Sequence, residues 1–534
     1  MMDKSSTHVL AFASVLHLLV LLLRLECMHG ATITSCSQTP YPEVCNHFLN
    51  STHFPSTGVL GELEGLEFHD KIYKVTMNHA IEAHRLITVM DLNSFTGRAK
   101  LAWNDCLELY EDTLNQLNRS LSSNNPTDAL TWMSAAIANQ QTCQNGFHDF
   151  NLSSNLQFFP NMLSNFSKLV SNALAVKKAA TLSSTTLYSR QIGGRRHLLS
   201  DHGLPTWVSA TDRKLLQSSA AKAKAHIVVA QDGSGDYHTI SAAVAASASG
   251  SKRFIIHVKA GVYRENVQIK KSNIMIIGDG IGATIVTGNR NVKGGWTTFR
   301  SATFAITGNH FIARDITFQN TAGPQNHQAV ALRSDGDFSV FYRCSFKGFQ
   351  DTLYVHSQRQ FYRDCYIYGT QDFIFGDAVV VLQNCNIFVR KPLKGQQNTI
   401  TAQGRTDPNE NTGIIIHNSR VIAARDLLPV QHSFQTYLGR PWKMYSRTVF
   451  MNCNLGSLIN PAGWLPWSGS FALRTLYYGE YMNVGSGANT AGRVKWPGYH
   501  IIRSPEKAEH FTVGNFLAGN SWIPRTGVPF VGGL

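Results

Sequence analysis

The first third of the chain carries apolar residues at the three- and four-residue spacing of amphipathic helices. The pattern is clearest over 106–117 and 129–138, where an apolar side chain returns about once per turn. Asp128, which follows Pro126 and Thr127, is expected to cap the second of these helices. Together the segments predict an all-α antiparallel four-helix bundle over residues 31–180.

From His226 onward the pattern changes to short β-branched and aromatic runs separated by Gly, Asn and Asp. Runs such as 254–258, 273–278 and 379–383 have the length and composition of strands, with turn residues between them. Few long helical periods interrupt the strands. An open sheet in which strands and helices alternate is therefore disfavoured.

Two segments of this β region repeat each other at an offset of 21 residues: Gly348–Tyr354 and Gly369–Phe375 each place a Gln-Asp pair ahead of an apolar run. The triplet Phe341–Arg343 returns at Phe361–Arg363. A period near 20 residues indicates a solenoid whose coils stack on one another. The sequence therefore predicts a multidomain protein whose C-terminal part is an all-β right-handed parallel β-helix.

Stacking would bring together the aspartates of the two copies, Asp351 and Asp372, because equivalent positions in adjacent coils lie about 4.8 Å apart. Two carboxylates held that close cannot both ionise freely, so one keeps a proton while the other stays charged. Such a pair can supply an acid and a nucleophile. A single aspartate at a β-helix turn is more commonly a turn residue, and the repetition of the pair is what favours chemistry.

With 534 residues, the chain is long enough for two or three units. Residues 1–30 have the pattern of a signal peptide, with Lys4 ahead of an apolar run that is shorter than a membrane span; an uncleaved signal anchor is the alternative. A Ser/Thr-rich stretch opens an expected linker over 181–216, and the β-helix unit is expected over 217–534. The pattern predicts a secreted protein.

Cysteine usage fits an exported protein, in which disulfides persist. Four early cysteines predict two bridges, and three later ones, Cys344, Cys365 and Cys385, would form a column in which two adjacent members could bridge. No Cys-x-x-Cys pair occurs, which argues against a zinc ribbon. The early cysteines are Cys36, Cys45, Cys106 and Cys143, and glycosylation sequons occur at Asn50, Asn118, Asn151 and Asn165.

Charge is concentrated in the β region. From Gln217 to the C-terminus there are 32 Lys and Arg against 17 Asp and Glu, a net charge of +15, whereas the remainder is close to neutral. A strongly basic exported unit indicates a polyanionic partner. An acidic polysaccharide fits secretion better than nucleic acid does, and charge that merely aids solubility is the plainer alternative. No His-Glu-x-x-His arrangement is present, and no metal or cofactor is expected.

Five segments of the β region stand out: Gly261–Glu265, Gln328–Leu332, Gly348–Leu353, Gly369–Gly376 and Leu438–Trp442. Together, and in this order, they resemble the signature segments of plant pectin methylesterases (pectinesterases), over roughly His226 to Pro524. The resemblance implies a cell wall enzyme that removes methyl esters from homogalacturonan, or pectin, to give pectate and methanol. The early segment with its four cysteines resembles the pectin methylesterase inhibitor fold, which implies an inhibitor-like pro-domain.

The resemblance implies catalytic roles for four side chains. Asp372 would be the nucleophile that attacks the ester carbonyl. Asp351 would protonate the departing methoxide and later take a proton from water. Gln328 and Gln350 would donate to the oxyanion of the tetrahedral intermediate.

Further site residues follow from the same resemblance. Arg440 would pair with Asp372, while Thr298, Gln328 and Trp442 would contact the substrate. Cys365 and Cys385 match the family's disulfide pair. In the linker, Arg213-Lys214-Leu215-Leu216 matches the family's processing motif, which implies a subtilase-type protease as a partner; the second basic cluster, 195–199, carries an inserted histidine. The other implied partners are pectin itself and an inhibitor, either the chain's own pro-domain or a separate protein.

Two other functions share part of this pattern. A β-helix glycosidase or lyase would act on the same polymer, since fold alone does not determine chemistry. A wall-polymer lectin would need only binding residues and would not require the full set of Gln, Asp and Arg. One position departs from the family: Gln371 stands before the nucleophile where Val or Ile is usual, which leaves the roles intact and puts the rate and pH optimum in question.

Overall fold

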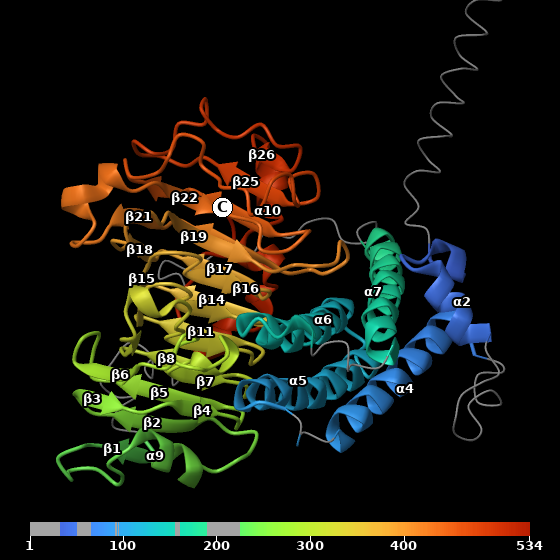
Figure 1. Ribbon diagram of the computed structural model, residues 1–534, viewed down its shortest axis with the longest axis horizontal. Coiled ribbons are helices and arrows are strands. Elements are labelled where there is room, and N and C mark those ends of the chain that lie inside the picture. The colour runs from blue at the N-terminus through green and yellow to red at the C-terminus, as the bar shows by residue number, and fades with distance from the viewer. Residues whose placement is uncertain (1–31, 51–65, 91–92, 94, 155–160, 189–224) are drawn as a thin grey trace, which may run out of the picture.

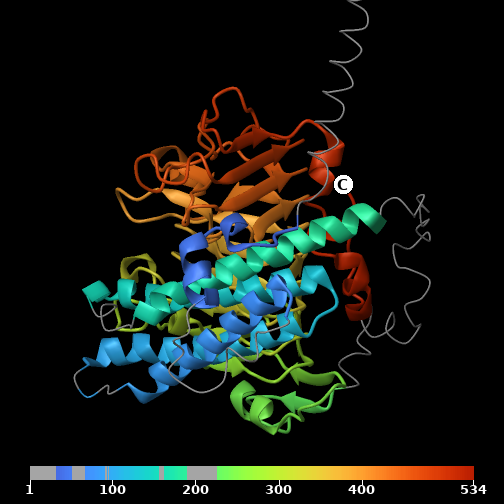
Figure 2. The same ribbon diagram turned by 90° about the vertical axis from the view of Figure 1, so that its right-hand side faces the viewer.

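The structure, a computed structural model, describes residues 32–50, 66–90, 93, 95–154, 161–188 and 225–534. Within these residues, a helical bundle lies beside a tall stack of parallel strands (Figure 1). After a 90° turn, the helices are seen to lie across one face of the stack (Figure 2). The predicted fold class is confirmed: an all-α bundle is followed by a right-handed parallel β-helix.

Where the structure describes it, the helical part contains a 3-10 helix, a short α-helix and four long α-helices: η1 (Cys36–Gln38), α2 (Pro42–Asn50), α4 (Phe68–Val89), α5 (Gly97–Leu121), α6 (Pro126–Asp149) and α7 (Asn161–Tyr188). None of the helices in the described ranges has the length and apolar character needed to span a membrane.

The start of α6 differs from the prediction. Pro126 occupies the first turn, where its missing N–H costs nothing, and Asn125 caps the helix by accepting from the backbone N–H groups of Thr127 and Asp128. Asp128 as the cap is therefore wrong. Its carboxylate lies inside the first turn and forms an ion pair with Arg359 of the β-helix.

Two disulfides hold the bundle together, which confirms the two early bridges: Cys36 is bonded to Cys45, and Cys106 to Cys143. The second joins α5 to α6. Helix α7 continues to Tyr188, past the boundary at residue 180 that the Ser/Thr-rich composition suggested. Ser and Thr lower helix propensity only slightly, so composition alone does not end a helix. The signal segment 1–30 and the processing motif 213–216 lie outside the described residues.

The β part winds through three parallel sheets. Sheet A contains β1 (Ile227–Val229), β2 (Phe254–Val258), β5 (Ile274–Gly278), β8 (Ile312–Arg314), β11 (Ser339–Tyr342), β14 (Arg359–Arg363), β17 (Val379–Gln383), β20 (Gly413–His417), β23 (Arg447–Met451), β25 (Tyr477–Tyr481) and β26 (Tyr499–Ile501). Sheet B contains β3 (Gly261–Arg264), β6 (Thr284–Gly288), β9 (Thr317–Asn320), β12 (Ser345–Lys347), β15 (Tyr366–Gly369), β18 (Asn386–Val389), β21 (Arg420–Ala423) and β24 (Asn454–Leu455). Sheet C contains β4 (Val267–Ile269), β7 (Phe304–Ile306), β10 (Leu332–Ser334), β13 (Leu353–Val355), β16 (Ile374–Gly376), β19 (Asn398–Gln403) and β22 (Thr436–Gly439).

Short helices connect or flank the coils: α9 (Ile240–Ala246), η4 (Phe299–Ser301), η5 (Pro324–Asn326), η6 (Leu428–Ser433), α10 (Pro505–Glu509), α11 (Val513–Phe516), η7 (Gly519–Ser521) and η8 (Ile523–Thr526). The apolar side chains that point inward from all three sheets form one continuous core, and the C-terminal helices cover the outer face of sheet A.

The strand register explains the sequence repeat. Leu353 of β13 pairs with Ile374 of β16, so the two Gln-Asp copies lie one coil apart, as predicted. The other echo is not the structural register: Phe341 pairs with Tyr362, one residue beyond the residue it matches in sequence. Their rings stack with centroids 4.6 Å apart. The coil is therefore 21 residues long here, and the 20-residue spacing of the triplet has no structural counterpart.

The later cysteines form the predicted column but not the predicted bond. Ser345, Tyr366 and Asn386 pair in register across β12, β15 and β18. The residue before each of them is a cysteine: Cys344, Cys365 and Cys385. All three, like Cys453, are buried free thiols, so the expected Cys365–Cys385 disulfide is wrong. The thiols of Cys365 and Cys385 donate instead to backbone carbonyls of the preceding coil. A buried free cysteine packs as a small apolar residue, so a place in the column does not require a bond.

The bundle packs on the outer face of sheet C. Tyr354 of β13 and Phe375 of β16 belong to the same buried apolar cluster as Trp103 and Phe147 of the bundle. Removing this apolar surface from water is the main force that holds the two parts together.

Buried polar groups of both parts also meet at the contact. Asp337 binds the guanidinium of Arg359 and accepts from the indole N–H of Trp132, at 2.7 and 2.8 Å. Burial opposes ionisation of Asp337, but Arg359 outweighs it and lowers the pKa of this carboxyl to about 2. The carboxylate therefore stays charged at the interface.

Candidate active site

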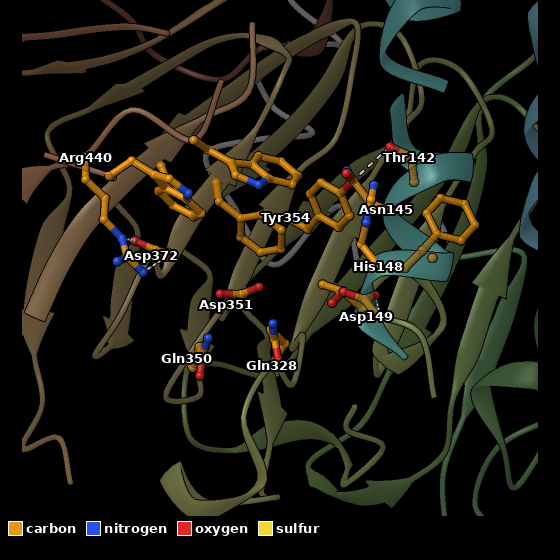
Figure 3. Close-up of a pocket in the computed structure, with 17 residues that line it drawn as sticks. Thr142, Asn145, His148, Asp149, Gln328, Gln350, Asp351, Tyr354, Asp372 and Arg440 are labelled. Atoms are coloured by element: carbon orange, nitrogen blue, oxygen red, sulfur yellow. Dashed lines mark hydrogen bonds and ion pairs between the residues drawn. The ribbon is translucent and has the colours of Figure 1, made fainter. Parts of the chain in front are cut away.

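A cavity of about 260 Å³ lies where α6 meets sheet C (Figure 3). All seven site residues expected in the β region line it: Thr298, Gln328, Gln350, Asp351, Asp372, Arg440 and Trp442. The remaining lining residues of the β-helix are apolar or aromatic, and the opposite wall belongs to α6. The seven residues are spread over more than 140 positions of the sequence, and the coils bring them together.

Asp351 and Asp372 occupy equivalent turns between sheet B and sheet C. Both have left-handed backbone, with φ of 61° and 49°, a conformation that Asp tolerates better than most residues. The turn is tight: a Cβ at Gly369, which opens the second copy, would lie 2.1 Å from the side chain of Phe373. A Cβ at Gly348 would likewise lie 2.6 Å from the side chain of Thr352, which explains why each copy begins with glycine.

Asp372 is held by three hydrogen bonds to its carboxylate. Nε and Nη2 of Arg440 donate to Oδ1 and Oδ2, at 2.8 and 2.6 Å. The hydroxyl of Thr399 donates to Oδ1 at 2.6 Å. Arg440 also lies over the ring of Trp467, 4.4 Å from its centroid. A bidentate guanidinium both orients a carboxylate and stabilises its charged form.

Asp351 has no such partner. Among the described residues, no hydrogen bond or ion pair reaches its carboxyl, although only 7 % of the residue is exposed. Burial raises the pKa of Asp351 well above its usual range, and the neighbouring charges of Asp372 and Asp149 raise it further against the opposing effect of Arg440. Asp351 therefore keeps its proton while Asp372, paired with Arg440, is poised as the anion.

The amides of Gln328 and Gln350 lie below the two aspartates in Figure 3. Neither side chain has a hydrogen-bond partner within the described residues, so both NH₂ groups are available to a ligand. Gln350 immediately precedes Asp351. The backbone N–H of Ala329 donates to the backbone carbonyl of Gln350, which leaves the side-chain amide of Gln350 unbound among the residues that the structure describes. Two convergent donors beside a nucleophile are what a developing oxyanion requires.

Aromatic rings line the β-helix side of the cavity, beside the two aspartates. Tyr354 and Phe375 stack with centroids 4.2 Å apart, and Trp442 meets Phe375 edge to face at 5.9 Å. Trp467 is 37 % exposed at the mouth of the cavity. Such surfaces suit the apolar faces of sugar rings. Trp467 was not predicted, because a tryptophan in an irregular loop carries no sequence signal of its own.

The helical bundle also lines this cavity, which the sequence did not predict. Oδ2 of Asp149, the last residue of α6, accepts from the backbone N–H of Thr298 at 2.7 Å. Burial raises the pKa of Asp149 to about 6, against the hydrogen bonds from Thr298. About two turns earlier in α6, the hydroxyl of Thr142 lies 3.2 Å from the hydroxyl of Tyr354 and 2.9 Å from Nε2 of His356.

Comparison with protein families agrees with this geometry. A family model described as Pectinesterase matches residues 226–520, which is more than half of the chain. The chain belongs to the pectinesterase family. A second model, described as plant invertase/pectin methylesterase inhibitor, matches residues 31–176.

Curated pectinesterases resemble the chain along nearly all of its length. A probable pectinesterase/pectinesterase inhibitor from Arabidopsis thaliana is 54 % identical over 531 residues, covering 94 % of each chain. Pectinesterase 2 from Citrus sinensis is 53 % identical over 503 residues, covering 93 % of this chain and 94 % of its own. The solved structure of pectin methylesterase from carrot is 60 % identical, with a TM-score of 0.58, and covers 58 % of this chain and 98 % of its own.

Other expected features of this pectinesterase lie away from the cavity or outside the described residues. Asn118 and Asn151 are exposed and Asn165 is half-buried, all in the pro-domain, while the side chain of Asn50 is not described. Their glycosylation stays a prediction. Among the described residues, no group of three or more His, Cys, Asp or Glu is arranged to hold a metal ion.

Proposed function

We propose that the chain hydrolyses the methyl esters of homogalacturonan, with Asp372 as nucleophile and Asp351 as general acid and then base. The observation that supports these roles most directly is the asymmetry of the two neighbouring carboxyls. One is bound by Arg440 and Thr399, and the other is buried without a partner and keeps its proton.

The reaction follows from these positions. The Asp372 carboxylate forms a bond to the ester carbonyl carbon, and the carbonyl electron pair moves to the oxygen, where Gln328 and Gln350 donate hydrogen bonds. When the pair returns, the bond to methoxide breaks, and methoxide takes the Asp351 proton to leave as methanol. Asp351 then takes a proton from the water that attacks the acyl-enzyme anhydride, which restores both aspartates and leaves a free galacturonate.

The partner chemistry agrees with the charge of the catalytic unit, whose net +15 favours a polymer that becomes more acidic as esters are removed. We place this activity outside the cell, in the cell wall. We also propose that a subtilase-type protease cleaves at Arg213–Leu216 to release the catalytic unit.

Until cleavage, the pro-domain is proposed to restrain the enzyme. Asp149 occupies the Thr298 N–H and Thr142 lies against Tyr354, so α6 stands where a polymer chain would pass over the aromatic wall. The intact chain should therefore release methanol more slowly than the same protein after the bundle has been removed. Equal rates would contradict the restraint.

The activity itself is tested by its products. The purified secreted protein should release methanol from highly methylated pectin while the length distribution of the polymer stays unchanged. Shortened chains would instead support the glycosidase or lyase reading, and pectin binding without either product would support the lectin.

A further inference from the structure

One buried threonine bonds the nucleophile twice. Thr399 of β19 lies one coil beyond Asp372: Ile374 pairs with Thr401 across β16 and β19, which places Thr399 level with Asp372. Its residue is 1 % exposed, so no water competes for its hydroxyl. The backbone N–H of Asp372 donates to Thr399 Oγ1 at 2.9 Å, and Oγ1 lies 2.6 Å from Asp372 Oδ1.

The direction of these two bonds is fixed by chemistry. A backbone N–H can only donate, so the first bond uses a lone pair of the threonine oxygen. A paired carboxylate can only accept, so the single hydroxyl proton of Thr399 must point at Oδ1. The two hydrogen bonds link the backbone N–H of Asp372, the Thr399 hydroxyl and the Asp372 carboxylate in a closed ring. Only one direction of donation satisfies both bonds, and this restrains the χ angles of Asp372.

The two oxygens of Asp372 are therefore unequal. Oδ1 accepts from Thr399 and from Nε of Arg440, whereas among the described residues only Nη2 of Arg440 donates to Oδ2. An oxygen with both lone pairs engaged is a poor nucleophile, because its electron density is already committed to donors. Oδ2 keeps one lone pair that faces away from the guanidinium.

The same strand also positions Arg440. Its backbone N–H donates to the carbonyl of Thr401 at 3.0 Å. The preceding residue must be glycine, since a Cβ at Gly439 would lie 2.1 Å from Oγ1 of Thr401. One strand, β19, thus sets the place of the ion pair from both sides: Thr399 holds the carboxylate and Thr401 holds the backbone that carries the guanidinium.

We infer that Thr399 is a positioning residue that makes Oδ2 of Asp372 the attacking oxygen. This inference rests on the proposed role of Asp372. In the attack, Oδ2 forms the bond to the ester carbon, and the carbonyl pair moves to the substrate oxygen. Oδ1 becomes the carbonyl oxygen of the anhydride and still accepts from Thr399. Thr399 touches neither the substrate nor the departing methanol, and it acts through Asp372 alone.

The test compares Thr399→Val, which keeps the shape and loses the hydroxyl, with Thr399→Ser, which keeps the hydroxyl. A hydrogen bond to a charged group is worth enough to change a rate by about 10- to 100-fold. Thr399→Val should lower kcat by about that factor with little change in KM. Thr399→Ser should keep most of kcat, because it keeps the hydroxyl.

Thr448→Val is the matched control, since Thr448 is equally buried in β23 and its hydroxyl has no hydrogen-bond partner in the structure. Methanol release by the secreted protein is the assay, with thermal unfolding measured on each variant. If Thr399→Val keeps the original kcat, or if Thr399→Ser loses as much kcat as Thr399→Val, the inference is overturned. If the unaltered protein releases no methanol, it is the proposed function that fails.

Discussion

The two Gln-Asp turns share their sequence, their left-handed backbone and their place between sheets B and C. They differ in what the next coils put beside them. Asp372 lies beside β19 and Arg440, which together supply three donors to its carboxylate, whereas the carboxyl of Asp351 lies near other carboxylates and receives no donor from the described residues. A repeat can therefore place two identical groups and leave their chemistry to their neighbours. Thr399 and Arg440, which lie outside both copies in the sequence, distinguish the nucleophile from the acid by binding only one of the two carboxyl groups among the described residues.

The largest effect should come from removing the charged member of the pair. Asp372→Asn keeps the size of the side chain and removes the nucleophile, so methanol release should fall by about 10⁴-fold or more. Asp364→Asn is the control, because Asp364 is another left-handed aspartate one turn earlier in the coil, outside the cavity. It should keep full activity. Comparable losses in both variants would mean that the turn, and not the carboxylate, was affected.

Replacing the protonated member should cost less and change the pH profile. Asp351→Asn removes the proton donor, a contribution of about 10²- to 10⁴-fold. In the unaltered enzyme the acid must hold its proton, so activity should fall as the pH rises through the raised pKa of Asp351. That alkaline limb should be absent from the residual activity of Asp351→Asn. An unchanged alkaline limb would assign it to another group and break the comparison.

The sequence predicted much of this comparison and missed its cause. The offset of 21 residues was enough to place Asp351 beside Asp372, because a parallel coil keeps register strictly. It could not say which aspartate ionises. Arg440 came from resemblance, since nothing in the repeat points 68 residues ahead. Thr399 was missed because one threonine in an alternating strand looks like any other.

Asp149 was missed for a different reason. Its position depends on how two separately patterned units dock, and no periodicity in either unit encodes that contact. The same limit applies to Asp128. Its local sequence predicts a helix cap, but in the structure its carboxylate forms an ion pair with Arg359 of the β-helix. Local pattern therefore fixed the elements, while groups whose partners lie in the other unit needed coordinates.

Docking of the pro-domain on the catalytic unit should depend on pH, because Asp149 brings a third carboxyl group close to Asp351. The docked pKa of Asp149, about 6, is above its usual value near 4, so docking is strongest below about pH 4 and weakens as the pH rises through 6. About two pKa units correspond to roughly 3 kcal/mol. Burial and then Lys443 also lower the pKa of His148. Asp149→Asn leaves His148 in place and therefore isolates the contribution of Asp149.

The measurement is the methanol release of the intact chain, divided at each pH by that of the protein freed of its bundle. This ratio should rise between about pH 4 and pH 7. In Asp149→Asn, whose amide resembles the protonated carboxyl, the ratio should stay low and flat. A ratio that rises equally in the variant would assign the pH dependence to another interface group.

The smallest effect should come from Gln371, the residue that makes the second copy look so much like the first. It lies in register with Gln350 but does not line the cavity, and its contribution to the turn is a backbone carbonyl that accepts from the N–H of Asp351 at 3.1 Å. Any side chain leaves that bond in place. Gln371→Val should therefore change kcat by no more than about 3-fold, within the range of substitutions away from catalytic contacts. Gln350→Leu, at the equivalent position of the other copy, should cost about 10²- to 10³-fold, because it removes an oxyanion donor. If the two glutamine variants lost activity equally, the copies would be alike in function as well as in sequence, and the distinction drawn from their neighbours would fail.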